Sequence, residues 1–346
     1  MASASVGLPA WRIAFTRDYR GHFHEKRTIM MPIQDPHRRK FLKQAALATL
    51  AGGAALHDGF AAAPASSRMT LGFSTYGMRG MKTEDAIMAL AKIGYDAVEL
   101  NVWPGRDLDA AKVPPKRAKA IGELARHWSI RPTALMENLK IERDAKKHAA
   151  ALERLRRAAA FARQIAPDAP PLVETTLGGG EWDQVKGLYQ ERLADWAEVG
   201  REMKTVMAIK PHRFGAMDRP AHAIELIKGL GEPKWLRMAY DFSHYAHRDM
   251  TLAATIKEAL PFTAFVAIKD TVMVGGKARF VLPGESGEID YVKLLRLFHE
   301  GGYRGDINCE VSGMVSGKKG YDPIRAAETS YANIAPAFVE AKVARP

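Results

Sequence analysis

Short apolar runs that end in polar residues recur along the chain, and segments with helical periodicity separate them. Alternating strands and helices favour a parallel sheet. Eight such units predict a closed (β/α)8 barrel, a TIM barrel, that fills residues 68–346 as a single domain. The predicted strands are Leu71–Ser74, Ala97–Asn101, Pro132–Glu137, Leu172–Thr176, Val206–Lys210, Leu236–Asp241, Phe265–Asp270 and Asp306–Glu310.

The segments between these runs carry helix start and stop signals. Thr83 suits the cap of the first helix, acidic residues follow it, and Gly94 suits its end. A long amphipathic helix is predicted from about 144 to 165. The stretch that contains Gly275 and Gly276, after the seventh strand, is predicted as a loop.

The carboxyl ends of TIM-barrel strands face one shared pocket, where this fold places its chemistry. Lys210, Asp241, Asp270 and Glu310 each end a predicted strand, so we expect them to converge there. A lysine at this mouth is held partly out of bulk water, which lowers its pKa and suits it to act as an electrophile, a base or an imine former. The alternative is a surface lysine paired with a neighbouring carboxylate.

Other polar and aromatic residues fall beside the same strand ends. His212 follows Lys210 and is a candidate catalytic residue, and His244 follows Asp241 as a ligand or a structural donor. Trp103 begins a loop and either forms the floor of a sugar-binding site or only packs against that loop. The predicted substrate contacts are Trp103, Glu137, Glu174, Arg213, Lys269 and Asp270.

Composition limits the classes of partner. The formal net charge of the 346 residues is +12, but residues 66–346 hold 42 Lys and Arg against 35 Asp and Glu. A moderately basic barrel is compatible with an anionic substrate, whereas the absence of a concentrated basic patch argues against nucleic acid. The single cysteine, Cys309, lies in a predicted strand and excludes an intramolecular disulfide.

The N-terminal extension, residues 1–67, contains a different signal. His37-Arg38-Arg39-Lys40-Phe41-Leu42-Lys43, followed by an alanine-rich apolar run, resembles a bacterial twin-arginine export signal, and Ala61-Ala62-Ala63 offers a cleavage site. An ordinary amphipathic helix is the alternative. The apolar run is too short for a confident membrane span, so we expect a periplasmic or otherwise extracytoplasmic barrel with no stable membrane span after signal removal.

Four motifs on the predicted strand ends and loops resemble one family. They are Tyr240-Asp241-Phe242-Ser243-His244, Ile268-Lys269-Asp270, Pro283-Gly284-Glu285-Ser286-Gly287 and Cys309-Glu310. Together they resemble the sugar phosphate isomerase/epimerase family with a xylose-isomerase-like TIM barrel. The resemblance implies one divalent ion, often manganese, held by a glutamate after the fifth strand, an aspartate after the sixth, a histidine on the seventh and a glutamate after the eighth. It also implies that the two glutamates shuttle a proton across a ketose and its enediolate.

The chain matches half of that ligand set. Asp241 and Glu310 stand at two of the four positions, whereas Lys210 replaces the fifth-strand glutamate and Ala267 replaces the histidine. In one hypothesis the Lys210 ammonium replaces the metal and, with His212, stabilises an enolate oxygen. Glu310 then moves the proton and Asp241 keeps Lys210 charged.

In the other hypothesis, a rearranged site still holds one manganese or zinc ion. Its ligands are Asp241, Glu310 and either His244 or His212, since carboxylate and imidazole suit these metals. No other cofactor is expected.

Three functions follow from these observations. The first is an exported isomerase or epimerase of a sugar or keto-sugar, which transfers a proton next to a carbonyl. The second is a lyase or hydrolase of 3-keto-glycosides, because proton abstraction beside a ketone also permits elimination. The third is a catalytically silent carbohydrate-binding barrel. A small-molecule carbohydrate is the partner in each case, and the multi-zinc, His-rich site of related DNA repair endonucleases is missing from this sequence.

Overall fold

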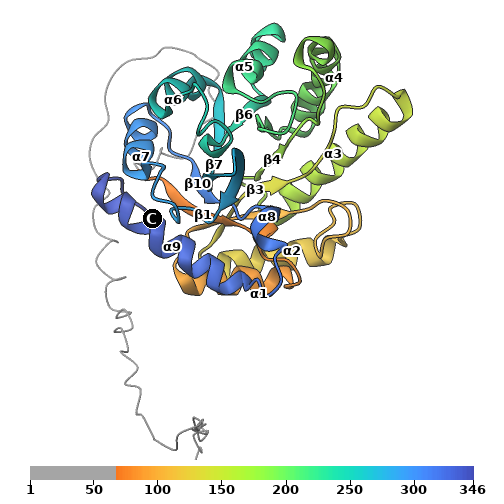
Figure 1. Ribbon diagram of the computed structural model, residues 1–346. Coiled ribbons are helices and arrows are strands. Elements are labelled where there is room, and N and C mark those ends of the chain that lie inside the picture. The colour runs from red at the N-terminus through yellow and green to blue at the C-terminus, as the bar shows by residue number, and fades with distance from the viewer. Residues whose placement is uncertain (1–67) are drawn as a thin grey trace, which may run out of the picture. The chain divides into compact units, whose positions relative to one another are not determined.

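A computed structural model describes residues 68–346 and shows eight parallel strands closed into a barrel (Figure 1). The barrel strands follow one another around the circle in chain order, with a two-stranded hairpin inserted between β7 and β10, and β1 closes the circle against β10. The strands are β1 (Thr70–Ser74), β2 (Ala97–Asn101), β3 (Arg131–Met136), β4 (Leu172–Thr175), β5 (Met207–Ile209), β6 (Leu236–Tyr240), β7 (Thr263–Ile268) and β10 (Asp306–Cys309). The (β/α)8 prediction is confirmed, and the predicted export signal lies outside the described residues.

Helices surround the barrel (Figure 1). The first ends at Gly94, whose φ of 113° is left-handed and is free of strain only for glycine, as the stop signal predicted. None of the helices in the described part of the chain is long and apolar enough to cross a membrane. The helices are α1 (Thr83–Ile93), α2 (Pro115–His127), α3 (Ala145–Ile165), α4 (Trp182–Met203), α5 (Pro220–Gly229), α6 (Leu252–Ala259), α7 (Tyr291–Glu300), the short α8 (Gly313–Ser316) and α9 (Pro323–Glu340).

One predicted loop is wrong. The segment after β7 forms an antiparallel hairpin of β8 (Asp270–Val274) and β9 (Lys277–Val281). Its two-residue turn is Gly275-Gly276, and both glycines have positive φ, 57° and 73°, as the favoured tight hairpin turns require. This hairpin carries Phe280 to the mouth of the barrel, where it lines the central pocket.

The barrel separates two apolar regions. The main core lies between strands and helices and takes alternate residues of each strand, such as Val98 and Val173. Inside the barrel a smaller cluster contains Phe265 and four alanines, at 134, 208, 239 and 267. These small side chains on four strands leave room in the interior for long polar side chains.

Candidate active site

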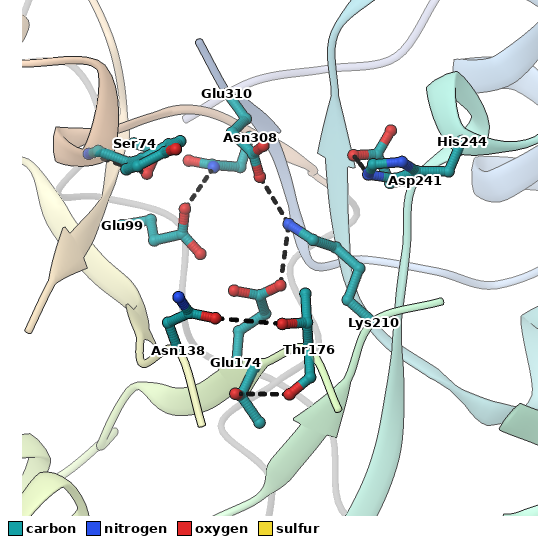
Figure 2. Close-up of polar contacts among 12 residues, drawn as sticks. Ser74, Glu99, Asn138, Glu174, Thr176, Lys210, Asp241, His244, Asn308 and Glu310 are labelled. Carbon is teal, nitrogen blue, oxygen red and sulfur yellow. Dashed lines mark hydrogen bonds and ion pairs between the residues drawn. The ribbon is translucent and has the colours of Figure 1, made fainter. Parts of the chain in front are cut away.

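Lys210 lies between two glutamates inside the mouth of the barrel (Figure 2). It directly follows β5, and its Nζ lies 2.9 Å from Glu174 Oε1 and 2.5 Å from Glu310 Oε2. Glu174 points inward because it alternates with the outward-facing Val173 of β4, and Glu310 directly follows β10. All three side chains are buried, so this is an internal ion-pair cluster rather than a surface lysine with a partner.

The charge state of Lys210 differs from the prediction. Burial lowers the pKa of its ammonium, but the surrounding carboxylates, first Glu174 and then Glu310, raise that pKa well above its ordinary value. The predicted lowering was therefore wrong, because the sequence did not show how many acids surround this lysine. Lys210 is a fixed cation, which suits charge stabilisation and does not suit a base or an imine former.

A second buried ammonium, that of Lys269, joins the same cluster. Lys269 directly follows β7, and its Nζ forms ion pairs with Asp241 Oδ2 and, at 3.0 Å, with Glu310 Oε1. Burial raises the pKa of Asp241, but the charge of Lys269 and the neighbouring His244 hold it well below its usual range. Asp241 was expected to keep Lys210 charged; its direct partner is Lys269, and it acts on Lys210 only through its field.

The two glutamates beside Lys210 have opposite acidities. Burial raises the pKa of Glu310, but Lys210 and Lys269 outweigh burial and lower it to about 2. For Glu174, burial and the charge of Glu310 raise the pKa more than Lys210 lowers it. Environments that push two carboxyl pKa values apart assign one group as base and the other as acid. Glu310 is the ionised member, and Glu174 accepts a proton more readily.

A third buried acid, Glu99 of β2, is not among the site residues predicted from the sequence. Its side chain is fully buried and accepts a hydrogen bond of 3.2 Å from Asn308 Nδ2 (Figure 2). Burial and the charge of Glu174 raise its pKa well above the usual range. The available signal was its place between Val98 and Leu100, since a carboxylate that alternates with outward apolar residues must face the barrel interior.

Both histidines of the site are neutral donors. Burial and the nearby His244 and Lys269 lower the pKa of His212 to about 2, and burial and Lys269 lower that of His244 to about 4. The Nδ1 of His212 accepts the Phe214 N–H at 3.3 Å, and the Nδ1 of His244 accepts the Arg213 N–H at 3.3 Å. The proton of each neutral ring therefore sits on Nε2, and His212 presents it at the central pocket.

The predicted metal ligands are not arranged around a metal position. Within residues 68–346 no group of three or more His, Cys, Asp or Glu is placed to hold a metal ion. The Lys269 ammonium lies between Asp241 and Glu310, and His244 Nε2 faces Asp241 Oδ2 at 3.4 Å. A divalent ion at this position would be repelled by two ammonium groups, so these residues do not fit the predicted manganese or zinc site.

The cluster opens into a cavity of about 400 Å³. Of the predicted site residues, Trp103, Glu137, Glu174, Lys210, His212, Lys269 and Glu310 line it. Aromatic side chains, Tyr76, Trp103, Phe214 and Phe280, form part of its wall. Glu137 is neutralised by Arg154, whose guanidinium lies 2.6 Å away. The pocket thus combines ammonium and imidazole donors, an ionised carboxylate and aromatic faces, which suit a small polyhydroxylated carbonyl compound.

Arg213 and Asp270 do not line this pocket. Arg213 donates from its guanidinium to the carbonyls of His244 and Ala246 and so ties down the loop after β6. Asp270 is buried and accepts hydrogen bonds from the amides of Gly284 and Ser286 and from the hydroxyls of Ser286 and Tyr291. The polar atoms of both residues are already hydrogen-bonded within the protein. Both residues therefore hold neighbouring loops in place.

Comparisons with known proteins agree with this fold. The family model described as xylose isomerase-like TIM barrel matches residues 87–332. The Mus musculus protein named "Putative hydroxypyruvate isomerase" is 31% identical over 94 residues, which cover 27% of this chain and 31% of that protein. The match therefore spans about a third of the length of that curated relative.

Solved structures show the same architecture at low identity. The IOLI protein with a binding zinc atom has a TM-score of 0.64 and 16% identity, over 78% of this chain and 98% of that chain. The apo form of 3-keto-D-glucoside 4-epimerase from E. coli has a TM-score of 0.61 and 14% identity, over 78% and 100% of the two chains. At these identities the likeness shows the fold alone.

Proposed function

Since the chain belongs to the xylose isomerase-like TIM barrel family, we propose that it is an isomerase or epimerase of a sugar or keto-sugar that moves a proton next to a carbonyl. The observation that carries this proposal is the buried Lys210 ammonium between Glu174 and Glu310. Proton transfer next to a carbonyl needs one group that stabilises negative charge on oxygen and another that takes the proton from carbon. Relatives named as isomerases and epimerases support the reaction class.

The ammonium groups supply the charge stabilisation. Lys210 has three N–H donors and two carboxylate partners, so one donor is left for the carbonyl oxygen of a substrate. As the C–H bond breaks, that oxygen gains negative charge, which Lys210 and Lys269 stabilise in a site shielded from water. The neutral His212 adds an Nε2–H donor at the same pocket.

Two carboxyl groups, those of Glu310 and Glu174, transfer the proton. Glu310, the ionised member, takes the proton from the carbon next to the carbonyl and leaves an enolate. The low pKa of Glu310, which Lys210 and Lys269 cause, disfavours proton uptake in the free enzyme. During the reaction the same lysines interact with the negative charge that forms on the substrate oxygen, and this interaction offsets the unfavourable proton uptake. A proton given by Glu174 to the opposite face of the same carbon yields the epimer, and the two carboxyl groups then exchange protons with solvent. A proton given by Glu310 to the neighbouring carbon, while the hydroxyl proton of that carbon passes to the former carbonyl oxygen, yields the isomer. No step passes through a metal, because ammonium groups stand where one was expected.

Solvent deuterium exchange tests this function. The protein is incubated in D2O with free ketohexoses and with 3-keto-glucosides, and the sugars are followed by NMR. We expect deuterium on the carbon next to the carbonyl together with a new stereoisomer or aldose. The variant Glu310→Gln keeps the shape of the site and should lose the exchange. A freed aglycone would replace this proposal with the lyase or hydrolase, and binding without deuterium uptake would replace it with the silent barrel.

Export by the twin-arginine route is a second part of the proposal. It is supported by the motif at residues 37–43 and the alanine-rich run that follows. In a bacterial host the periplasmic fraction should contain a form shortened near Ala63, and replacement of Arg38 and Arg39 by lysine should leave the longer form in the cytoplasm. An unshortened protein in the cytoplasm without these substitutions would contradict the proposal.

A further inference from the structure

A second cavity, of about 280 Å³, lies beside the catalytic pocket at the same end of the barrel. It is formed by the loops that follow β1 and β2, because its lining residues come from 75–86 and 101–108. The residues that matter for its chemistry are Arg79, Thr83, Asn101 and Arg106. None of them takes part in the proton transfer described above.

Asn101, the last residue of β2, is the first sign of a ligand there. Its side chain is only 5% exposed, and neither Oδ1 nor Nδ2 has a hydrogen-bond partner among the described residues. Its backbone N–H donates to Thr75 Oγ1 at 2.8 Å, which fixes the backbone and leaves the amide at the cavity. Leaving a buried amide unpaired is unfavourable, so such a group is normally satisfied by a ligand or by ordered water.

Two arginines supply positive charge at the same cavity. The guanidinium of Arg106 lies 4.9 Å from the ring centre of Trp103, and that of Arg79 lies 5.4 Å from the ring centre of Tyr76. Neither forms an ion pair with a carboxylate in residues 68–346. The Arg106 guanidinium also lies 5.8 Å from the ring centre of Tyr76, the ring that Arg79 contacts, so the two cations are near each other. In keeping with this, burial and then the charge of Arg79 lower the pKa of Arg106. Paired guanidinium groups of this kind suit a carboxylate or a phosphate.

An acid, Asp107, also lines this cavity, and it is already paired within the protein. Asp107 accepts hydrogen bonds from Lys82 Nζ at 2.9 Å, from the N–H and hydroxyl of Thr83, and from Arg117. Its charge is therefore balanced by Lys82 and by Arg117, which it shares with Glu84. Helix α1 begins at Thr83, whose backbone N–H already donates to Asp107, so the start of this helix is not counted among the anion-binding groups.

We infer that this second cavity is an oxyanion subsite that binds a phosphate or carboxylate group through Arg79, Arg106 and the Asn101 amide. The two guanidinium groups make cation–π contacts with the rings of Tyr76 and Trp103, and these two aromatic residues line the catalytic pocket. The subsite therefore adjoins the pocket, and an acyclic sugar phosphate or sugar acid can place its anionic end there. The binding site itself stands without the proposed function, whereas assigning it to the substrate rests on that function.

Binding is tested first, without turnover. The full chain is titrated with inorganic phosphate and, separately, with malonate by calorimetry, and the variant Arg79→Gln/Arg106→Gln is compared with Arg126→Gln. Arg126 is an exposed arginine near the end of α2, so this control removes charge without touching the cavity. We expect the double variant to bind at least about tenfold more weakly, since charge-assisted hydrogen bonds are lost, and the control to bind normally.

The two anions separate the sources of the ligand. Tighter binding of phosphate indicates a phosphate ester, and tighter binding of malonate indicates a sugar acid. Equal affinities of the double variant and the control, or no binding of either anion by the unsubstituted protein, would overturn the subsite. Melting curves check that the double variant is folded, and Asn101→Ala should weaken binding with both arginines intact.

Turnover then tests the assignment to the substrate. The double variant should keep its kcat/KM for a neutral keto-sugar and lose about tenfold or more for the anionic one, because only the anionic substrate engages the arginines. An equal loss for both would refute the assignment to the substrate. Anion binding that depends on the arginines, with no deuterium exchange in any sugar, would keep the subsite and refute the proposed isomerase or epimerase.

Discussion

Replacement of Lys210 by methionine separates the electrostatic and catalytic roles of the buried cluster. Methionine has nearly the same length and no charge, so Lys210→Met removes the ammonium and keeps most of the packing. Glu174 then loses its direct cationic partner, at 2.9 Å, whereas Glu310 keeps Lys269 at 3.0 Å. The main consequence in the folded state is therefore one uncompensated buried carboxylate.

The expected loss of stability follows from this single uncompensated carboxylate. Removing one partner of a buried ion pair costs about 3–5 kcal/mol of the free energy of unfolding. For domains of about this size, each kcal/mol lowers Tm by about 2–4 °C, so we expect a fall of roughly 6–20 °C near neutral pH. Glu174 already has a raised pKa, and loss of Lys210 raises it further. The destabilisation should therefore shrink toward low pH, where Glu174 is protonated, and grow as pH rises through its folded-state pKa.

A charge-balanced partner completes the measurement. Lys210→Met/Glu174→Gln removes both charges, so its Tm at neutral pH should recover most of the loss, and Glu174→Gln alone completes the cycle. Turnover should not recover with stability, because loss of one donor to a developing oxyanion costs about 10²–10³ in kcat. Thermal melts and deuterium exchange on the four proteins provide the two readouts.

Two outcomes would refute this reasoning. If Lys210→Met melts within about 2 °C of the unsubstituted protein at neutral pH, the ammonium does not compensate Glu174. If the double variant recovers both stability and turnover, Lys210 has no role in charge stabilisation during the reaction.

Three further predictions concern other parts of the molecule. Asp306 is buried, and burial raises its pKa to about 7 from an ordinary 3.8. Its stabilising contribution is therefore complete at low pH and is lost as pH rises through 7. The Tm of Asp306→Asn should rise relative to that of the unsubstituted protein between pH 5 and pH 8, and a constant difference in Tm would contradict this. A Cβ at Gly122 would lie 2.1 Å from the Ile165 carbonyl oxygen, so Gly122→Ala should cost about 1–3 kcal/mol in urea unfolding, whereas Gly187→Ala, at an open helical site, should be neutral or stabilising. Metal analysis of the purified protein should find less than stoichiometric manganese or zinc, and turnover should survive a chelator; chelator-sensitive activity that manganese restores would overturn the role given to Lys210 and Lys269.

Most of the barrel could be predicted from local patterns. Strand and helix periods repeat along the chain, and turn signals separate them, so the eight predicted strands agree with those observed to within two residues at each end. The hairpin after β7 was missed because Gly275-Gly276 fits both a loop and a tight turn. Only pairing of Asp270–Val274 with Lys277–Val281 distinguishes the two.

The sequence by itself determined that Lys210, Asp241 and Glu310 lie at strand ends, because strand ends are a local property and the barrel gathers them at one mouth. Only the tertiary structure decided which acid meets which lysine. Lys210 and Glu310 are 100 residues apart in the chain, yet their Nζ and Oε2 atoms are 2.5 Å apart. Because each pKa depends on burial and on every charge within a few ångströms, the sign of the Lys210 shift was fixed by that three-dimensional arrangement and not by any local pattern.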